Sequence, residues 1–274
     1  MAELTRKEVI QLLAVVNGES AGVRLAGVDL SGLDLRALNL QQADLRLANL
    51  KGAQLSKAHL NSANLSGANL EGADLSGCDA TSATFTSAIL RDAKLFNATL
   101  REGIFTAVDA VGADFHDADL TEARMNLADL SSVDLSRALM TRARLSKAHL
   151  GGADMVDAML QHADLTDVNL DLADCTRANI SHAFLQRASI INATLEWANL
   201  RDSNFSDVLL SRTNLSNADC SRAIFRSAQM RGVIVRDTNL SAATLRDAQI
   251  ERDALLYALL SGTTLPDGST SLDA

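Results

Sequence analysis

Apolar residues recur every five positions along most of the chain. Every residue whose number is a multiple of five, from Leu25 to Ile250, is apolar; these are 46 consecutive sites, and 29 of them are Leu. Two residues before each of these central sites, 32 of 46 residues are Ala, and between the two positions 24 of 46 are Asp or Asn. The two residues after each centre are mostly Ser, Thr, Gly, Arg or other polar types. The repeating unit is therefore a pentad with two inward-facing positions.

A period of five excludes both regular secondary structures. In an α-helix, five residues advance about 140°, so the apolar sites would be spread around the whole helix. In a continuous strand alternate centres would point to opposite faces, because five is odd. The chain must instead turn once per pentad and wind into coils that stack through backbone hydrogen bonds as a solenoid. Proline removes a backbone donor, and the single proline, Pro266, lies beyond the repeats.

The segment ANLSGANLEGADLSG, residues 63–77, shows the pattern at its most regular. It resembles the A(D/N)LXX motif of the pentapeptide-repeat family, and the resemblance extends over residues 21–255 without an insertion. The family resemblance implies an all-β fold: a right-handed quadrilateral parallel β-helix with 20 residues per coil, here of about eleven coils. The LeuProAspGly sequence at 265–268 is similar to the tails of many cyanobacterial members.

Both ends of such a solenoid need covers, since its last coils expose an apolar interior and unpaired edges. Thr5 and Glu8 have the spacing of a capping box, and the sequence predicts a helix over residues 5–16, with an apolar face of Val9, Ile10, Leu12, Leu13 and Val16. A second short helix is predicted over 251–262, with Asp253 as N-cap and Gly262 as stop. We therefore expect a helical cap at 1–20, the β-helix at 21–255, and a cap helix with a tail at 256–274.

The core positions predict close packing without disulfides. Only 3% of the residues are aromatic, and five of the seven Phe occupy central sites. We expect Phe105 and Phe115 to face each other across Ala110, so that large side chains are offset by a small one. The three cysteines occupy inward positions at wide spacing, which favours buried structural thiols; they are Cys78, Cys175 and Cys220.

No catalytic, cofactor or metal motif stands out, and we expect no enzyme activity and no cofactor. His162 and His182 are 20 residues apart and should stack about 5 Å from each other, but no third ligand converges on them. The other histidines, His59, His116 and His149, are interpreted as solvated surface residues. We predict no metal site.

Charge and hydropathy narrow the choice of partners. The net charge of −9 argues against direct nucleic-acid binding and against attraction to anionic lipid. No apolar run is long enough to span a membrane. The acidic residues Glu3 and Glu8 interrupt what would be the basic region of a signal peptide, so we expect a cytoplasmic protein.

Two surface features are candidate binding sites. With four sides per coil, the side centred on residues 35, 55, 75 and so on carries ten acids and six bases. Its acidic stripe consists of Asp114, Asp134, Asp154 and Asp174. The second feature is a group of large apolar residues at outward positions: Phe184, Ile191, Trp197, Leu172 and Leu209. Clustered exposed apolar residues mark contacts with other molecules.

Two functions from different classes follow from these surfaces. The first is a non-enzymatic rigid scaffold that binds a partner protein through the apolar group. The alternative comes from a distant resemblance to the quinolone-resistance branch of the family: a DNA mimic whose acidic side binds DNA gyrase or another type II topoisomerase. In that branch a C-terminal element forms a two-fold dimer, which implies a homodimer contact at Leu256, Tyr257 and Leu260, with a simple cap as the other interpretation.

Overall fold

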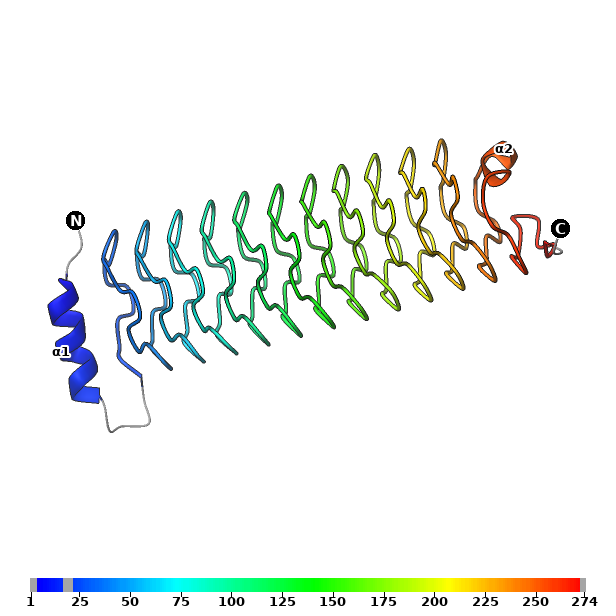
Figure 1. Cartoon of the computed structure of the whole chain (residues 1–274). Coiled ribbons are helices and arrows are strands. Elements are labelled where there is room, and N and C mark those ends of the chain that lie inside the picture. Colours follow the sequence, from blue (N-terminus) through cyan, green and yellow to red (C-terminus); the bar gives the residue numbers. More distant parts are fainter. Residues whose placement is uncertain (1–3, 17–21, 272–274) are drawn as a thin grey trace. The chain divides into compact units, whose positions relative to one another are not determined.

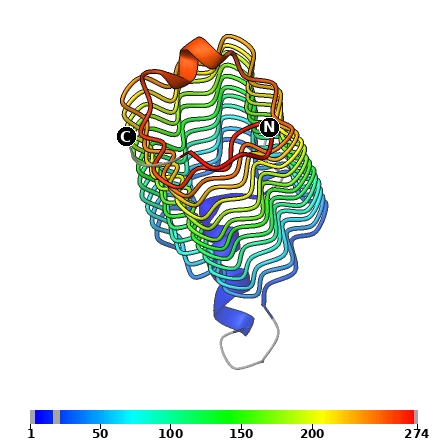
Figure 2. The same ribbon diagram turned by 90° about the vertical axis from the view of Figure 1, so that its right-hand side faces the viewer.

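The structure, a computed structural model, describes residues 4–16 and 22–271, which fall into two compact units. The first unit is Met1–Leu139 and the second is Met140–Ala274. Within each unit, successive turns of backbone stack on one another with the same outline, as Figures 1 and 2 show. The first unit also contains helix α1, Arg6–Val16, and the second contains the single-turn helix α2, Arg252–Leu255.

The coils repeat every 20 residues. The residue before each centre forms a parallel bridge with the residue 20 positions later, as Asp74 does with Lys94 in the first unit and Asp174 with Thr194 in the second. Twenty residues are four pentads, so each coil has four sides and four corners. The strands are single bridged residues, because each side is short and each corner turns the chain away. This confirms the 20-residue coil.

Three of the five N–H groups in a pentad join neighbouring coils, and a fourth closes the corner. In residues 65–69, the N–H groups of the first, third and fifth residues donate to carbonyl oxygens of adjacent coils over 2.7–3.0 Å, and the N–H of the fourth, Ala68, donates to the Leu65 carbonyl oxygen of the same turn at 3.0 Å. The second, the N–H of Ser66, donates instead to the side-chain Oδ1 of Asn64 at 3.0 Å. Proline is therefore excluded from four positions of the pentad by these backbone hydrogen bonds, but not from the second. Pro266 occupies that second position, directly after Leu265.

Every corner uses the same backbone geometry. From residue 27 to residue 247, the second residue after each centre has a positive φ, between 53° and 72°, at all 45 corners. Nine of these residues are Gly and none is Val, Ile or Thr. A positive φ at the third residue of a four-residue turn is typical of a type II turn. Branching at Cβ is strongly disfavoured in this conformation, which explains the absence of β-branched residues.

The central sites and the Ala-type sites line a closed core inside each unit, as the pattern predicts. Phe105 stacks on Phe85 with ring centroids 4.7 Å apart and meets Phe115 edge-on at 6.2 Å. Gly103 occupies an Ala-type site, where a Cβ would lie 2.7 Å from the Phe105 ring. The predicted contact of Phe105 with Phe115 is confirmed, and the space for the Phe105 ring comes from Gly103 as well as from the neighbouring alanines.

Hydroxyl side chains replace Ala at four buried positions of the second unit. Each hydroxyl donates to the carbonyl oxygen of the residue 23 positions earlier, so none is left unsatisfied in the core. The pairs are Ser203 with Ile180 at 2.6 Å, Thr238 with Leu215 at 2.7 Å, Thr263 with Leu240 at 2.7 Å, and Thr213 with Ile190. Polar residues at these sites are therefore compatible with the repeat.

Helix α1 begins with the predicted capping box and packs on the first unit. The N–H of Thr5 donates to the Glu8 carboxylate at 2.7 Å, and the Thr5 hydroxyl oxygen accepts from the Glu8 N–H at 3.3 Å. Arg6 ties the helix to the coils through the carbonyl and carboxylate of Asp34, at 2.7 and 3.0 Å. Val9 is fully buried, whereas Ile10 and Leu12 are exposed and Leu13 is half-buried. The packed face of α1 is thus narrower than the apolar pattern predicts.

The C-terminal end differs from the sequence-based prediction. Helix α2 ends at Leu255, Glu251 takes the N-cap position instead of Asp253, and no side chain caps the helix. The chain then returns to the ladder, because Leu259 bridges Asn239. The predicted helix over 251–262 is therefore wrong beyond residue 255, and the coil continues into the segment assigned to a cap helix and tail.

A hairpin covers the last ladder edge. The chain reverses at residues 265–269, and Thr264 forms an antiparallel bridge with Thr270. The N–H of Leu265 donates to the carbonyl of Ser269 at 2.7 Å, and Asp267 accepts the Ser269 N–H at 2.9 Å. This turn pairs backbone groups that would otherwise form an open edge. Residues 272–274 lie outside the described part of the chain, as do 1–3 and 17–21.

Candidate protein-interaction surfaces

The acidic stripe consists of two pairs of carboxylates, one in each unit. In the first unit Asp114 bridges Asp134, and in the second Asp154 bridges Asp174, so each pair stands on adjacent coils. Each carboxylate is held by the local fold, because its Oδ1 accepts the N–H two residues later at 2.9–3.1 Å. Like charges in directly opposite positions destabilise a sheet, and packing must offset that repulsion.

Arginines neutralise other acids on the same side. Arg137 pairs with Asp117 at 2.7 Å, and Arg177 pairs with Asp157 at 2.6 Å. The hydrogen bonds from Arg137 lower the pKa of Asp117. The surface around the stripe is therefore one of mixed charge.

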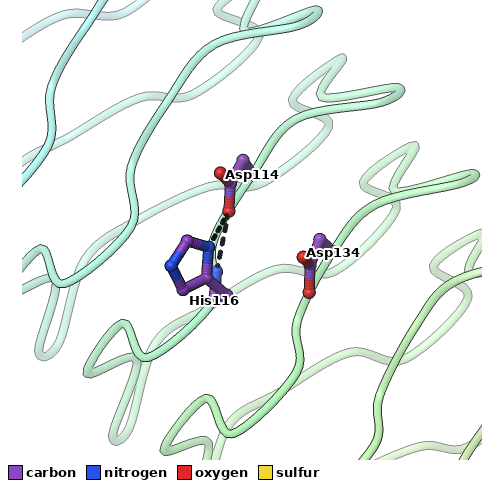
Figure 3. A group of neighbouring side chains, drawn as sticks. All are labelled: Asp114, His116 and Asp134. Carbon is purple, nitrogen blue, oxygen red and sulfur yellow. Dashed lines mark hydrogen bonds and ion pairs between the residues drawn. The ribbon is translucent and has the colours of Figure 1, made fainter.

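His116 joins the Asp pair of the first unit. It follows Asp114 by two residues, and its Nδ1 lies 2.6 Å from Asp114 Oδ1 (Figure 3). Asp134 faces them from the next coil, and one donor atom from each residue lies within 4.8 Å of the others. The 20-residue spacing predicts that Asp114 and Asp134 are neighbours, but it does not predict the contact of His116 with Asp114, and the interpretation of His116 as a solvated surface residue misses this group.

The apolar group in the second unit is exposed but does not form one continuous patch. Trp197 is 61% exposed, Leu172 67% and Phe184 51%, whereas Ile191 and Leu209 are half-buried. Leu172 and Ile191 meet on adjacent coils, where the N–H of Leu172 donates to the carbonyl of Ile191 at 2.9 Å.

Pentad numbering separates the members of this group. Ile191 and Trp197 lie at the two corners that bound the side centred on Leu195. Phe184 points outward two sides earlier, on the side centred on Leu185. The structure thus places Trp197, Ile191 and Leu172 around one side of the coil and leaves Phe184 apart from them.

The C-terminal residues form a second apolar surface. Leu256 is 76% exposed, Tyr257 is 67% exposed and Leu260 is half-buried. Next to them lies a cavity of 860 Å³ between α2 and the terminal hairpin, lined by Leu255, Leu259 and Pro266 among others. The sequence predicts a contact surface at Leu256, Tyr257 and Leu260 but does not predict this cavity.

The cysteines offer no reactive centre. All three are free thiols and buried. Burial raises the pKa of Cys78 to about 12 and that of Cys175 to about 12, and it also raises the pKa of Cys220. The thiolate, the reactive form, is therefore strongly disfavoured.

Comparison with known families agrees with the fold. The pentapeptide repeat family matches residues 24–61, 63–101, 105–137, 138–174, 169–207 and 203–247, in eight copies. The chain belongs to the pentapeptide repeat family. Proteins of this family form right-handed quadrilateral β-helices, so the predicted fold class is confirmed for the repeat region.

Several solved pentapeptide repeat structures are similar to this chain. HetL, a protein involved in heterocyst differentiation regulation in the cyanobacterium Nostoc sp. strain PCC 7120, is 27% identical, with 98% of this chain and 100% of HetL covered and a TM-score of 0.50. A thylakoid-lumen pentapeptide repeat protein of Arabidopsis thaliana is 23% identical, with coverages of 51% and 72% and a TM-score of 0.30. Full-length QnrB1, a plasmid-mediated fluoroquinolone resistance protein, is 18% identical, with coverages of 77% and 91% and a TM-score of 0.26.

No curated protein sequence matches the chain. Among residues 4–16 and 22–271, no helix combines the length and the apolar character needed to cross a membrane.

Proposed function

We propose that this pentapeptide repeat protein is a non-enzymatic β-helical scaffold that binds a partner protein at the side centred on Leu195. Trp197 carries the proposal. Its side chain is 61% exposed, while its backbone is held at a corner with φ 61° by a hydrogen bond from its N–H to the Ser216 carbonyl oxygen at 3.1 Å. A large aromatic residue on a fixed backbone loses little conformational entropy on binding, and tryptophan is enriched among the residues that dominate binding energy.

Neighbouring apolar residues extend the surface. Ile191 lies at the opposite corner of the same side, and its N–H donates to the Asp171 carboxylate at 2.8 Å. Leu172 is exposed one coil away, and Leu209 lies on the adjoining side. We call Trp197, Ile191, Leu172 and Leu209 the Trp197 surface. Phe184 points to another side, so under this proposal it contributes only to a partner that wraps around the coil.

A regulatory role fits a protein of this kind. HetL, which is similar to this chain over nearly its whole length, is involved in regulating differentiation. A scaffold without reactive thiols regulates by occupying a partner's surface rather than by chemistry on it. The partner is therefore expected to be a protein with an apolar pocket that receives an indole ring.

The test compares Trp197→Ala with Leu127→Ala. Leu127 is also an exposed corner residue, with 56% of its surface accessible, but it belongs to the first unit. Each immobilised variant is exposed to extract of the source cells, and a protein retained by wild type is then purified and titrated against all three. The proposal predicts at least about tenfold weaker binding for Trp197→Ala only. Equal loss in both variants, or in neither, contradicts it.

The alternative is a DNA mimic that binds DNA gyrase through the acidic side. Two observations favour it. The first is that Asp114 stands beside Asp134 and Asp154 beside Asp174. The second is that none of these four carboxylates forms an ion pair with Arg or Lys in the described part of the chain. A supercoiling assay at low and high salt tests it. Inhibition that weakens with salt, and that is lost when the four are changed to Asn, supports mimicry. Inhibition that the changes leave intact contradicts it.

A homodimer through Leu256, Tyr257 and Leu260 is a separate proposal. It would cover the exposed leucine and tyrosine next to α2. Light scattering coupled to gel filtration measures the mass of wild type and of a Leu256→Ser, Tyr257→Ser variant. A dimer that the variant converts to monomer supports the contact, whereas a wild-type monomer at high concentration contradicts it.

A further inference from the structure

Three metal-ligating side chains meet on the first unit. Asp114 and His116 flank the central residue Phe115, and Asp134 faces them from the next coil (Figure 3). One donor atom from each of the three lies within 4.8 Å of the other two. All three residues are half-buried. They therefore face solvent from a partly sheltered position, where an ion could enter.

The fold holds these ligands in place. Asp114 Oδ1 accepts the N–H of His116 at 3.1 Å as well as lying 2.6 Å from its Nδ1. Phe96, one coil away, stacks on the imidazole with ring centroids 5.1 Å apart and only 6° between the planes. Asp134 Oδ1 accepts the Ser136 N–H at 2.9 Å. Binding would thus require small side-chain rotations, since the backbone and the ring orientation are already set.

The local charge favours a cation. Asp44, Asp109, Asp117 and Asp119 of the same unit each pair with an arginine at 2.7–3.2 Å. Asp134 forms no such pair within the described residues, and the side chain that Asp114 contacts is the His116 imidazole, at 2.6 Å. Lys94 bridges Asp114 from the preceding coil, but its ammonium makes no ion pair with it in the described part of the structure. A bound cation would relieve the repulsion between the two carboxylates.

We propose that Asp114, His116 and Asp134 bind a divalent transition-metal ion, with Zn²⁺ as the probe. An imidazole nitrogen with two carboxylate oxygens suits Zn²⁺, whereas Mg²⁺ and Ca²⁺ prefer ligand sets made only of oxygen. Three protein ligands at about 2.1 Å leave a fourth position for water or for a ligand from a partner.

The stacked pair His162 and His182 in the second unit serves as a comparison. Their ring centroids are 4.9 Å apart, and His182 Nε2 lies 3.8 Å from Asp202. Arg222 already binds that carboxylate at 2.6 Å, so a metal ion there would have to displace a guanidinium or bind through the two rings alone. We expect this pair to bind Zn²⁺ more weakly.

The test is a calorimetric titration of the full untagged chain with Zn²⁺ in the presence of excess Mg²⁺. We expect one tight site per chain. His116→Ala and Asp134→Asn should each weaken it at least about tenfold, and His182→Ala should leave it unchanged. Lys94→Gln should tighten it severalfold, because the variant removes a positive charge next to Asp114. Far-UV circular dichroism shows whether each variant is folded.

Cobalt supplies a readout that does not depend on affinity. Co²⁺ in place of Zn²⁺ should give visible absorption bands that His116→Ala changes and His182→Ala does not. The proposal is overturned if wild type binds no Zn²⁺ at millimolar concentration, or if His116→Ala and Asp134→Asn bind as wild type does. Loss of the site in His182→Ala with retention in His116→Ala would also overturn it, by placing the metal in the second unit.

Discussion

The Oδ1 atom of Asp74 accepts the backbone N–H of Ser76 at 2.9 Å. This bond satisfies the one N–H of the pentad that donates to no backbone carbonyl oxygen. The same bond occurs at 23 of the 24 Asp or Asn residues that precede a central site; Asp109, which instead pairs with Arg91, is the exception. The preference for Asp or Asn before each central site thus has a structural cause.

Asp74→Ala should therefore destabilise the protein more than Asp74→Asn. Alanine leaves the Ser76 N–H without its side-chain partner, which costs about 1 kcal/mol, whereas the amide oxygen of Asn keeps the bond. Urea unfolding of the two variants and wild type measures the difference. If Asn costs as much as Ala, the charge of Asp74 and not its hydrogen bond is what stabilises the corner.

This bond also shows how far the sequence could predict the fold. The period of five excludes a helix and a continuous strand, and it locates the core sites. Because every coil is closed, a side chain that points inward must be buried. Whether Asp114 and Asp134 mark a function or only the repeat could not be decided from pattern alone. The hydrogen bonds that Asp114 and Asp134 accept at their corners explain why the repeat has Asp at both positions. They do not explain why residue 116 is a histidine.

The C-terminal end was less predictable, for a physical reason. Leu255, Leu256, Leu259 and Leu260 have helical spacing, and local preference favours a longer helix. The structure resolves the conflict in favour of the ladder: Leu259 returns to pair with Asn239. A bridge between residues 20 positions apart is a tertiary interaction, and a local apolar pattern does not report it.

Corner geometry gives a second prediction. Gly72 has φ 62°, and no atom lies within 4 Å of the position a Cβ would take. Gly72→Val should nevertheless destabilise by about 2 kcal/mol and Gly72→Ala by about 1 kcal/mol or less, because a positive φ penalises branching at Cβ. Thermal unfolding of both variants measures this. Equal effects of Val and Ala would show that the corner relaxes to a negative φ.

Packing beside Phe105 gives a third prediction. Gly103→Ala places a Cβ 2.7 Å from the Phe105 ring and 2.9 Å from the Leu100 carbonyl oxygen, so the ring must shift within a closed core. We expect a loss of about 1–3 kcal/mol in the free energy of unfolding. Gly151→Ala is the control, since its new Cβ would meet atoms only at 3.7 Å or beyond. A Gly103→Ala variant as stable as Gly151→Ala would mean that the Phe stack has room to move.

The three buried cysteine thiols give a fourth prediction. Because burial raises the pKa of Cys78 and of Cys175 to about 12, neither forms appreciable thiolate at pH 8. The native protein should react with no equivalents of a thiol reagent such as Ellman's reagent, and the urea-unfolded protein with three. Rapid labelling of one thiol at neutral pH without denaturant would show that the coil around it opens.

Acid stability gives the last prediction. Arg222 donates hydrogen bonds to both carboxylate oxygens of Asp202, at 2.7 and 2.6 Å, and these bonds lower the pKa of Asp202. Below pH of about 4, where an Asp of the unfolded chain takes up a proton, the unfolded state binds more protons than the folded state. The stabilisation from this pair is therefore fully present near pH 6 and is lost as the pH falls through the lowered pKa.

Arg222→Gln tests the sign of this effect. It should reduce stability more at pH 6 than at pH 3, because Asp202 is largely protonated in the unfolded state at the lower pH and little of the pair's contribution remains to be lost. Arg226→Gln removes the same charge in the same unit, from a guanidinium that forms no ion pair among the residues the structure describes. It should change stability by similar small amounts at both pH values. Urea unfolding of both variants at the two pH values decides: a loss in Arg222→Gln that is independent of pH would show that the arginine acts through packing of its aliphatic stem and not through the carboxylate.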